Sequence, residues 1–214
     1  MTNSFSHPLF RQVPVVGILR GLTADQIAPV VTAARDGGLT NLEITMNTPG
    51  AVDQIRAALK IAGSALNIGA GTVTNLDLLD AALAAGASFI VTPIVGTRVI
   101  ERCVKLGVPI FPGAFSPTEI FKAWELGATM VKVFPAETLG PGFIKNVKAP
   151  CPQLRLMPTG GVDLTTLEAY KKAGADAYGV GSPLFRPERL AAADWPWLQQ
   201  QCAQFAQAAR EIKN

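Results

Sequence analysis

Short apolar runs rich in β-branched residues alternate along the chain with amphipathic stretches of helical length, and the alternation occurs eight times. Runs of this kind predict strands, whereas apolar residues spaced by three and four predict one face of a helix. The predicted strands are 13–20, 41–46, 66–73, 89–94, 108–115, 130–136, 154–161 and 177–185. The predicted helices are 23–36, 51–61, 75–85, 97–106, 116–126, 142–148, 164–173 and 194–213. Eight βα units in about 200 residues predict a single-domain α/β fold, a (β/α)8 TIM barrel over residues 13–214 with a C-terminal helix, after an N-terminal tail at 1–12.

Residues at the ends of these segments support the assignment. Ser116 and Glu119 form a capping box, with Pro117 at the first helical position. Gly86 and Gly107 each follow a helical stretch and precede a strand, where a left-handed glycine commonly ends a helix. The alternative fold is a doubly wound open sheet, which more often carries G-x-G-x-x-G after its first strand. Here that turn is Arg-Gly-Leu-Thr at 20–23.

Composition narrows the classes of partner. The chain has 214 residues, of which 49% are hydrophobic and 16% charged, and its net charge is +3 without any long basic run. Nucleic acid is therefore not an expected partner, although a local basic pocket for an anionic metabolite is compatible with this charge. No stretch of about 18 apolar residues occurs, so no membrane partner is expected. The first twelve residues lack the basic start and apolar block of a secretory signal, which predicts a cytoplasmic protein.

Cysteine and histidine usage excludes several chemistries. The three cysteines, Cys103, Cys151 and Cys202, are odd in number, far apart and without a C-x-x-C pair, which argues against a disulfide framework or a zinc site. His7 is the only histidine. A Ser-His-Asp triad or a multi-histidine metal site cannot be assembled from one histidine in one chain. No metal site is therefore expected.

A single lysine, Lys132, interrupts the apolar run of the sixth predicted strand. Alternate strand residues face opposite sides, so if Val131 and Val133 face the helices, Lys132 points into the barrel. Burial disfavours the charged form and lowers a lysine pKa, and the neutral amine can attack a ketone to form a Schiff base. The alternative is a lysine whose amine reaches solvent at the edge of the sheet.

Glu43 occupies the equivalent place in the second strand. Leu42 and Ile44 take the helix side, which directs Glu43 inward toward Lys132. A carboxyl group beside a buried amine is a candidate general acid/base. The alternative is a buried structural ion pair between the two.

Further polar and glycine residues stand at the C-terminal ends of the strands, where TIM-barrel enzymes place their sites. Arg20 suits a carboxylate or phosphate, or else is a solvent-exposed rim residue. Two glycines precede Thr72 and permit close approach of a ligand, whereas Pro93 removes an amide donor and is otherwise only a strand end. Strands seven and eight end in glycines that suit a phosphate, or that simply form tight turns: Gly160, Gly161 and Gly181, the last followed by Ser182.

Together these motifs resemble the 2-keto-3-deoxy-6-phosphogluconate (KDPG) aldolase family of class I aldolases. The family also includes 2-keto-3-deoxy-6-phosphogalactonate (KDPGal) and 4-hydroxy-2-oxoglutarate (KHG) aldolases. The resemblance covers nearly the whole chain, and its motifs lie at 17–21, 42–45, 69–72, 131–137, 158–161 and 181–182.

The resemblance implies a role for each candidate residue. Lys132 would form the Schiff base and Glu43 would move protons through a water molecule. Arg20 and Thr72 would hold the pyruvate part, with Pro93, Phe134 and Thr159 as further substrate-binding residues; the phosphate would lie on Gly160, Gly161, Gly181 and Ser182. The resemblance also implies KDPG cleavage to pyruvate and glyceraldehyde 3-phosphate without a cofactor, and a homotrimer.

The sequence leaves the substrate epimer open. Many gluconate-type members carry an arginine shortly after the strand-two glutamate, whereas this chain has Asn47, which resembles the galactonate type. Thr159 resembles the gluconate type. From the residues alone, a barrel isomerase or epimerase of sugar phosphates and a non-catalytic phosphate-binding module are alternatives from other classes. A metal-dependent aldolase is disfavoured by the single histidine.

Overall fold

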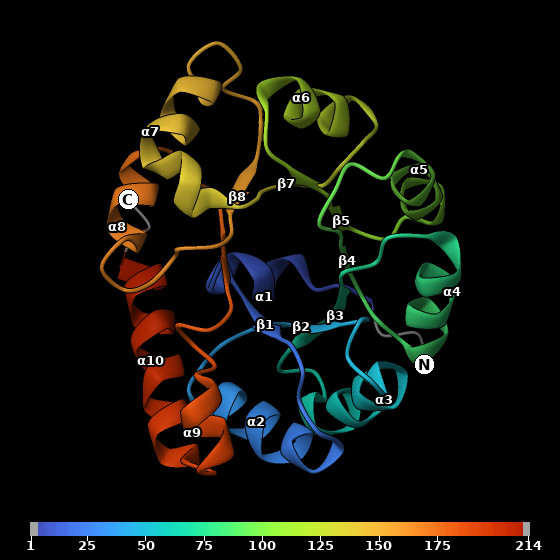
Figure 1. The fold of residues 1–214 in the computed structure, drawn as a ribbon, viewed down its shortest axis with the longest axis vertical. Coiled ribbons are helices and arrows are strands. Elements are labelled where there is room, and N and C mark those ends of the chain that lie inside the picture. The colour runs from blue at the N-terminus through green and yellow to red at the C-terminus, as the bar shows by residue number, and fades with distance from the viewer. Residues whose placement is uncertain (1–3, 212–214) are drawn as a thin grey trace.

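Parallel strands curl into a barrel in the computed structural model of the protein, which describes residues 4–211. Figure 1 shows the strands inside a ring of helices. The strands are β1 (Val15–Leu19), β2 (Asn41–Thr45), β3 (Asn67–Gly71), β4 (Ile90–Val91), β5 (Ile110–Phe111), β6 (Gly113–Ala114), β7 (Val131–Val133), β8 (Leu156–Pro158) and β9 (Tyr178–Val180).

The pairing of the strands closes the barrel. One sheet has the order β5-β4-β3-β2-β1-β9 and the other has the order β6-β7-β8, all pairs being parallel. A parallel bridge between Thr159 and Gly179 joins β8 to β9. Only Pro112 separates β5 from β6. The two therefore occupy one of the eight strand positions, or staves, of the barrel in the described chain. The expected (β/α)8 barrel is confirmed.

The fifth stave differs from the continuous run predicted at 108–115. Its first half pairs with β4, whereas its second half pairs with β7. Pro112 lies at the change of partner: it has no N–H to donate, and its carbonyl accepts a hydrogen bond from the Lys132 N–H at 2.9 Å. One proline thus divides the stave.

The helices follow the strands in the expected order. They are α1 (His7–Gln12), α2 (Ala24–Asp36), α3 (Ala51–Ala62), α4 (Leu76–Ala85), α5 (Thr97–Leu106), α6 (Pro117–Glu125), α7 (Ala136–Lys148), α8 (Leu167–Lys172), α9 (Pro187–Ala191) and α10 (Trp195–Glu211). The predicted strand 130–136 is too long and the predicted helix 142–148 too short, because α7 begins at Ala136 and continues past a non-helical Gly140 (φ 69°, ψ 172°). The prediction at 194–213 extends beyond the described residues.

The interior of the barrel is filled by large side chains at its N-terminal end. Phe10, Val16, Phe89, Val91, Phe111, Met130, Met157 and Ala177 form one buried cluster. Alternate residues such as Leu42, Val131 and Val133 belong to the larger layer between strands and helices. This separation follows from the two faces of each strand, and it leaves the opposite, C-terminal end for polar groups.

The segment at 1–12, expected to be a tail, is folded in its described part. Helix α1 contains Phe10, which is only 8% exposed, and Figure 1 shows α1 inside the ring of the other helices. The Ser6 N–H donates to the Asn67 Oδ1 at the start of β3, at 2.7 Å. This segment therefore covers the N-terminal end of the barrel. The domain boundary at residue 13 stays a prediction.

Candidate active site

A cavity of about 550 Å³ opens at the C-terminal ends of β1, β7, β8 and β9. Eight of the eleven candidate residues line it: Arg20, Lys132, Phe134, Thr159, Gly160, Gly161, Gly181 and Ser182. They come from four different staves, and the closure of the barrel brings them together. The cavity lies where TIM barrels place their active sites.

Lys132 is the buried cation of this cavity. It lies in the middle of β7 and is 5% exposed, with its Nζ 4.8 Å from the centre of the Phe134 ring. Burial lowers the pKa of Lys132 from its ordinary value; the nearby Glu43 acts in the opposite direction and Arg20 adds to the lowering. The amine therefore loses its proton more readily than a solvated lysine, as a nucleophile requires.

Glu43 lies in β2 and is 1% exposed. Its Oε2 has no hydrogen-bond partner among residues 4–211. Burial raises the pKa of Glu43, and Lys132 and then Arg20 oppose that rise. A carboxyl group with a raised pKa exchanges protons nearer to neutral pH than an ordinary glutamate does.

Glu43 and Lys132 act on each other through space. Each is the strongest charged influence on the pKa of the other. In the described part of the chain, however, the two side chains are not close enough to form an ion pair. A direct ion pair between the two, the alternative for Glu43, is therefore not formed in this geometry.

Glycine makes room for the carboxylate of Glu43. A Cβ on Gly71, at the end of β3, would lie against the Glu43 Oε1 and 2.8 Å from its Cδ. The predicted reason for the glycines at 69–72 was close approach of a ligand. At Gly71 the close neighbour is instead a side chain of this protein.

Thr159 and the glycines after β8 form another part of the cavity wall. Thr159 is 4% exposed, and its hydroxyl lies so near Gly179 that a Cβ there would collide with it. Gly160 and Gly161 have φ of 91° and 69°, which are left-handed values that glycine adopts at least cost. Glycine at these two positions is thus required by the turn itself, and the turn faces the cavity.

Three candidates are not among the residues lining the cavity: Glu43, Thr72 and Pro93. Glu43 is connected to the cavity electrostatically through Lys132 and Arg20. Thr72 has a left-handed φ of 58°, which is rare for a β-branched residue and costs about 1–3 kcal/mol. The carbonyl of Pro93 packs against Gly113, where a Cβ would collide with it.

The structure adds lining residues that the sequence analysis did not single out. Glu137, in the first turn of α7, and Ile18 and Phe185 line the cavity. The parity of β1 could have identified Ile18, since it alternates with the inward Val16. Asn47 is exposed and does not line the cavity.

Residues 4–211 lack two further features, a cluster of metal-binding side chains and a membrane-spanning helix. These residues contain no group of three or more histidine, cysteine, aspartate or glutamate side chains placed to hold a metal ion. In the same range no helix combines the length and the apolar character needed to cross a membrane.

Comparison with known proteins gives a consistent result. The family model for KDPG and KHG aldolases matches residues 7–201. The 2-dehydro-3-deoxy-6-phosphogalactonate aldolase of Escherichia coli is 37% identical over 205 residues, which are 94% of this chain and 96% of the relative. The 2-dehydro-3-deoxy-phosphogluconate aldolase of Pseudomonas aeruginosa is 42% identical over 75% of this chain and 71% of the relative.

Solved structures agree with the sequence relatives. A native KDPGal structure superposes with a TM-score of 0.87 at 36% identity and covers 94% of this chain and 96% of its own. The family match agrees with the parallel barrel and with the buried lysine in the cavity at its C-terminal end. The chain therefore belongs to the KDPG and KHG aldolase family, and its named relatives are aldolases, which are carbon–carbon lyases.

Proposed function

We propose that the protein is a class I aldolase that cleaves KDPG to pyruvate and glyceraldehyde 3-phosphate, with Lys132 as the Schiff-base residue. The observation that carries this proposal is the buried amine of Lys132, whose pKa is lowered by burial and which lines a cavity edged with glycines. Such an amine suits attack on a ketone carbon. No organic cofactor or metal ion takes part in the proposed steps.

The reaction needs a place to hold the electron pair of the broken C3–C4 bond. The neutral amine of Lys132 adds to the C2 ketone, and loss of water gives a protonated Schiff base. Glu43, directly or through a water molecule, takes the proton of the C4 hydroxyl. The C3–C4 electrons move to form an enamine, and glyceraldehyde 3-phosphate leaves as the aldehyde. Protonation of the enamine and hydrolysis then release pyruvate and restore the amine.

The remaining candidates position the substrate in this proposal. Arg20 and Thr72 hold the pyruvate part, and Pro93 and Phe134 contribute to the same region. The phosphate lies on the turn at Gly160 and Gly161 and on the segment at 181–182, where backbone N–H groups suit an anion. Binding energy from the phosphate orients C4, so an unphosphorylated substrate should lose kcat as well as affinity.

Thr159 favours the gluconate epimer. Thr159, which resembles the gluconate type, lines the cavity, where its hydroxyl can distinguish the two C4 configurations, whereas Asn47 is exposed outside it. KDPGal is the second candidate substrate, because a KDPGal aldolase and a KDPGal structure both match 94% of the chain. Steady-state kinetics on both 6-phosphate epimers test the preference. A higher kcat/KM for KDPGal would contradict it.

Reduction with borohydride in the presence of pyruvate tests the imine. We expect a stable pyruvate adduct on the peptide that contains Lys132, with loss of activity, and no adduct in Lys132→Met. Lys122→Met is the control because Lys122 is exposed on α6, outside the cavity. Full lyase turnover in Lys132→Met would overturn the mechanism and favour an electrostatic role for the lysine.

We also infer a homotrimer, as the family resemblance implies. A designed protein cage made by fusing symmetric oligomeric domains contains a chain that is 37% identical to this one, and the match covers 94% of this chain and 73% of the cage chain. Several large apolar residues are exposed in the described chain: Ile94, Val104, Leu106, Phe115 and Phe121. Light scattering coupled to size exclusion should give three times the chain mass of 22.5 kDa.

A further inference from the structure

A second cavity, of about 470 Å³, lies at the N-terminal end of the barrel. It shares no lining residue with the cavity that Lys132 lines at the C-terminal end. Strand β7 runs between the two, since Met130 lines this cavity and Lys132 lines the other. The lining comes from the N-terminal segment, from the starts of the strands and from α8 and α10: Phe5, His7, Phe10, Arg11, Pro14, Phe111, Thr129, Met130, Arg155, Lys171, Ala175, Asp176, Tyr178 and Ala209. We name it the lower cavity.

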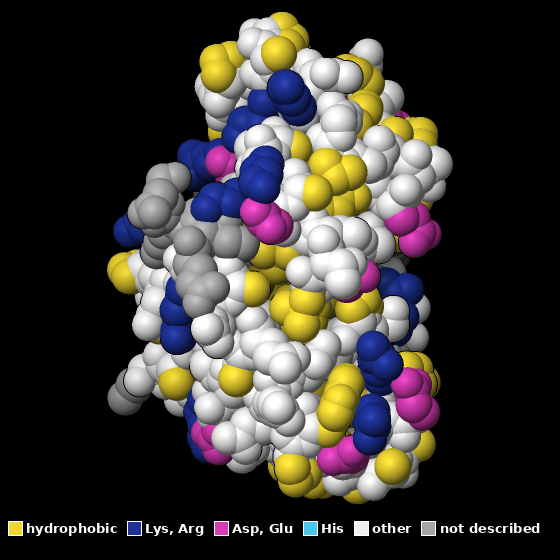
Figure 2. Space-filling view, turned by 90° about the vertical axis from the view of Figure 1, so that its left-hand side faces the viewer, with side chains coloured by type: hydrophobic (Ala, Val, Ile, Leu, Met, Phe, Trp, Pro, Cys, Tyr) yellow, Lys and Arg dark blue, Asp and Glu magenta, His cyan; other side chains and the backbone are white. Residues whose placement is uncertain are grey.

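The charged groups of the lower cavity are mainly positive. Arg11, Arg155 and Lys171 line it, and in the described chain the side chains of Arg11 and Lys171 make no hydrogen bond or ion pair. The guanidinium of Arg155 lies 5.6 Å from the ring centre of Trp124. Figure 2 shows lysine and arginine side chains gathered over the upper half of the side that carries α7 and α8. The lower cavity therefore has cations available for an anion.

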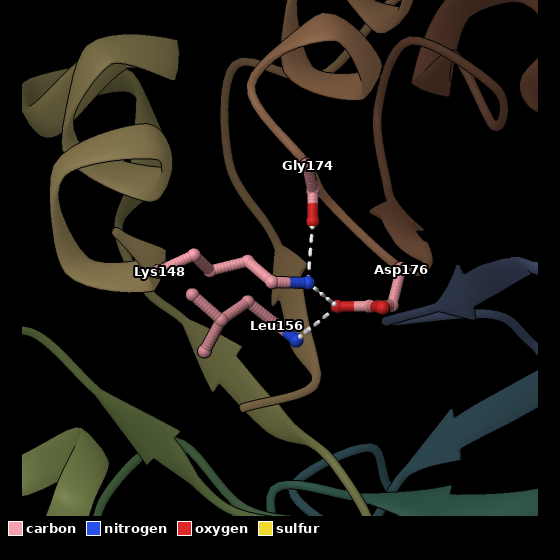
Figure 3. Close-up of polar contacts among 4 residues, drawn as sticks. All are labelled: Lys148, Leu156, Gly174 and Asp176. Atoms are coloured by element: carbon pink, nitrogen blue, oxygen red, sulfur yellow. Dashed lines mark hydrogen bonds and ion pairs between the residues drawn. The ribbon is translucent and has the colours of Figure 1, made fainter. Parts of the chain in front are cut away.

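Asp176, the acidic residue of the lining, is already paired. Its Oδ2 accepts hydrogen bonds from the Lys148 Nζ and from the Leu156 N–H, both at 2.8 Å (Figure 3). The same Nζ donates to the Gly174 carbonyl at 2.8 Å. Lys148 thus pairs with Asp176, which leaves less of this negative charge to oppose an anion in the cavity. Among the lining cations, Lys171 also interacts electrostatically with the exposed Glu168 of α8.

Aromatic rings form the apolar wall. Phe5 and Phe10 each lie near Phe111, with ring centres 6.3 and 5.6 Å apart, and the His7 ring packs edge-on against Phe5 at 4.9 Å. A flat apolar group placed against this wall would make offset or edge contacts, which aromatic rings prefer. Rings on one side and cations on the other favour a ligand with two different ends.

Tyr178 adds a hydrogen-bond donor without a partner. It is only 3% exposed, yet among residues 4–211 nothing accepts or donates a hydrogen bond to its hydroxyl. Burial, together with the charge of Asp176, raises the pKa of Tyr178 to about 12, so the phenol keeps its proton. The hydroxyl is not completely enclosed, so it can donate a hydrogen bond to a ligand atom in the cavity.

We propose that the lower cavity binds a small aromatic anion, in which a planar ring carries one carboxylate, sulfonate or phosphate group. The ring lies against Phe5, Phe10 and Phe111. The anionic group meets Arg11 and Lys171, and Tyr178 donates to it. The volume lies within the range of small-molecule sites. This site is separate from the aldolase reaction and does not depend on it.

Fluorescence titration with 8-anilinonaphthalene-1-sulfonate, which carries one sulfonate on a planar naphthalene ring, tests the proposal. We expect saturable binding, with a Kd about tenfold higher in Arg11→Glu. Tyr178→Phe keeps the ring and removes only the hydroxyl, and its Kd should rise about three- to tenfold. Arg102→Glu is the matched control on α5, exposed and outside the lower cavity, and should change the Kd by less than about twofold. Retained aldolase activity shows that each variant is folded.

Competition distinguishes the two ends of the ligand. Indole-3-acetate and adenosine monophosphate should displace the dye, whereas indole or inorganic phosphate alone should not do so at the same concentration. Unchanged dye binding in both Arg11→Glu and Tyr178→Phe would place the dye elsewhere and overturn the proposal. Displacement of the dye by indole alone would show non-specific hydrophobic binding. An equal rise in Kd in Arg102→Glu would show that only the net charge of the protein matters. Either result would also overturn the proposal.

Discussion

Glu43 keeps a buried carboxylate oxygen without a hydrogen-bond partner, an arrangement that costs free energy and that folding alone would not favour. Lys132 has a similar cost, because burial opposes its charge more strongly than Glu43 supports it. The two groups therefore destabilise the fold slightly while making both side chains ready to exchange protons. Stability and reactivity are opposed at these two residues.

Glu43→Gln separates these effects through pH. The pKa of Glu43 is raised in the folded protein, so the stability linked to its neutral form is complete below about pH 4.5 and is lost as the pH rises through the folded pKa. Glutamine does not titrate. The free energy of unfolding of the variant should therefore gain on that of the wild type as the pH rises from 5 to 8. Urea denaturation at the two pH values measures this gain.

Activity provides the second measurement for the same variant. The amide cannot accept the C4 hydroxyl proton, so kcat should fall by about 10²- to 10⁴-fold. For the stability measurement, the contrary result is a variant whose free energy of unfolding falls relative to that of the wild type as the pH rises. It would show that the carboxyl group of Glu43 is better stabilised in its ionised form than its burial indicates.

Gly71→Ala tests whether the position of the carboxylate matters. The new methyl group would lie against the Glu43 Oε1 and push the carboxylate away from its present position. Displacement of a catalytic group by about 1 Å lowers turnover about a hundredfold, so we expect kcat to fall about ten- to a hundredfold. Steady-state kinetics measure the change.

Gly142→Ala is the control for that substitution. A Cβ at Gly142 has nothing within 4 Å, and Gly142 lies in α7 away from the lining of the cavity. Its kcat should match the wild type. Wild-type kcat in Gly71→Ala would mean that the carboxylate has room to move or that its exact position is unimportant.

At this scale, alternation along the strands was the informative signal. It predicted that Lys132 and Glu43 face the same interior, because the side of each residue depends only on its parity within the strand. It could not predict which strand-end residues reach the cavity. Thr72 and Pro93 follow the strands, where the backbone leaves the regular geometry, and Glu137 lies in a helix turn whose start was predicted too late.

At the scale of elements, local signals succeeded where one residue determines the geometry. The Ser116–Glu119 capping box is present, and Gly86 and Gly107 are left-handed at their helix ends. The sequence signals did not predict the boundaries of elements that follow each other closely in the chain. The stave at 108–115 is divided at Pro112, and α7, which only two residues separate from the end of β7, continues across Gly140. Neither change alters the hydrophobic pattern, so periodicity could not reveal it.

At the scale of the whole molecule, the two ends of the barrel differ in character. The C-terminal end holds the buried Lys132 and the glycine turns, whereas the N-terminal end is lined by aromatic residues, including Phe5 and Phe10 from the first segment of the chain, with the cations of the lower cavity beside them. The eight repeats predicted the barrel but not this closure. Two phenylalanines in a short segment have no periodicity, and their partners, Phe89 and Phe111, are about a hundred residues away in sequence.

Removal of one of these rings should therefore weaken the fold without affecting catalysis. Phe10 is 8% exposed and packs 5.6 Å, centre to centre, from Phe111, so Phe10→Ala should lower the free energy of unfolding by about 3 kcal/mol. Its kcat at 25 °C should stay near the wild-type value, because the lysine lies at the other end of the barrel. Arg11→Ala is the control, since Arg11 is the exposed neighbour on the same helix and should change stability by less than about 0.5 kcal/mol. Urea unfolding and steady-state kinetics measure both quantities. A large fall in kcat for Phe10→Ala, in protein that is still folded, would mean that the aromatic end and the catalytic end of the barrel are coupled.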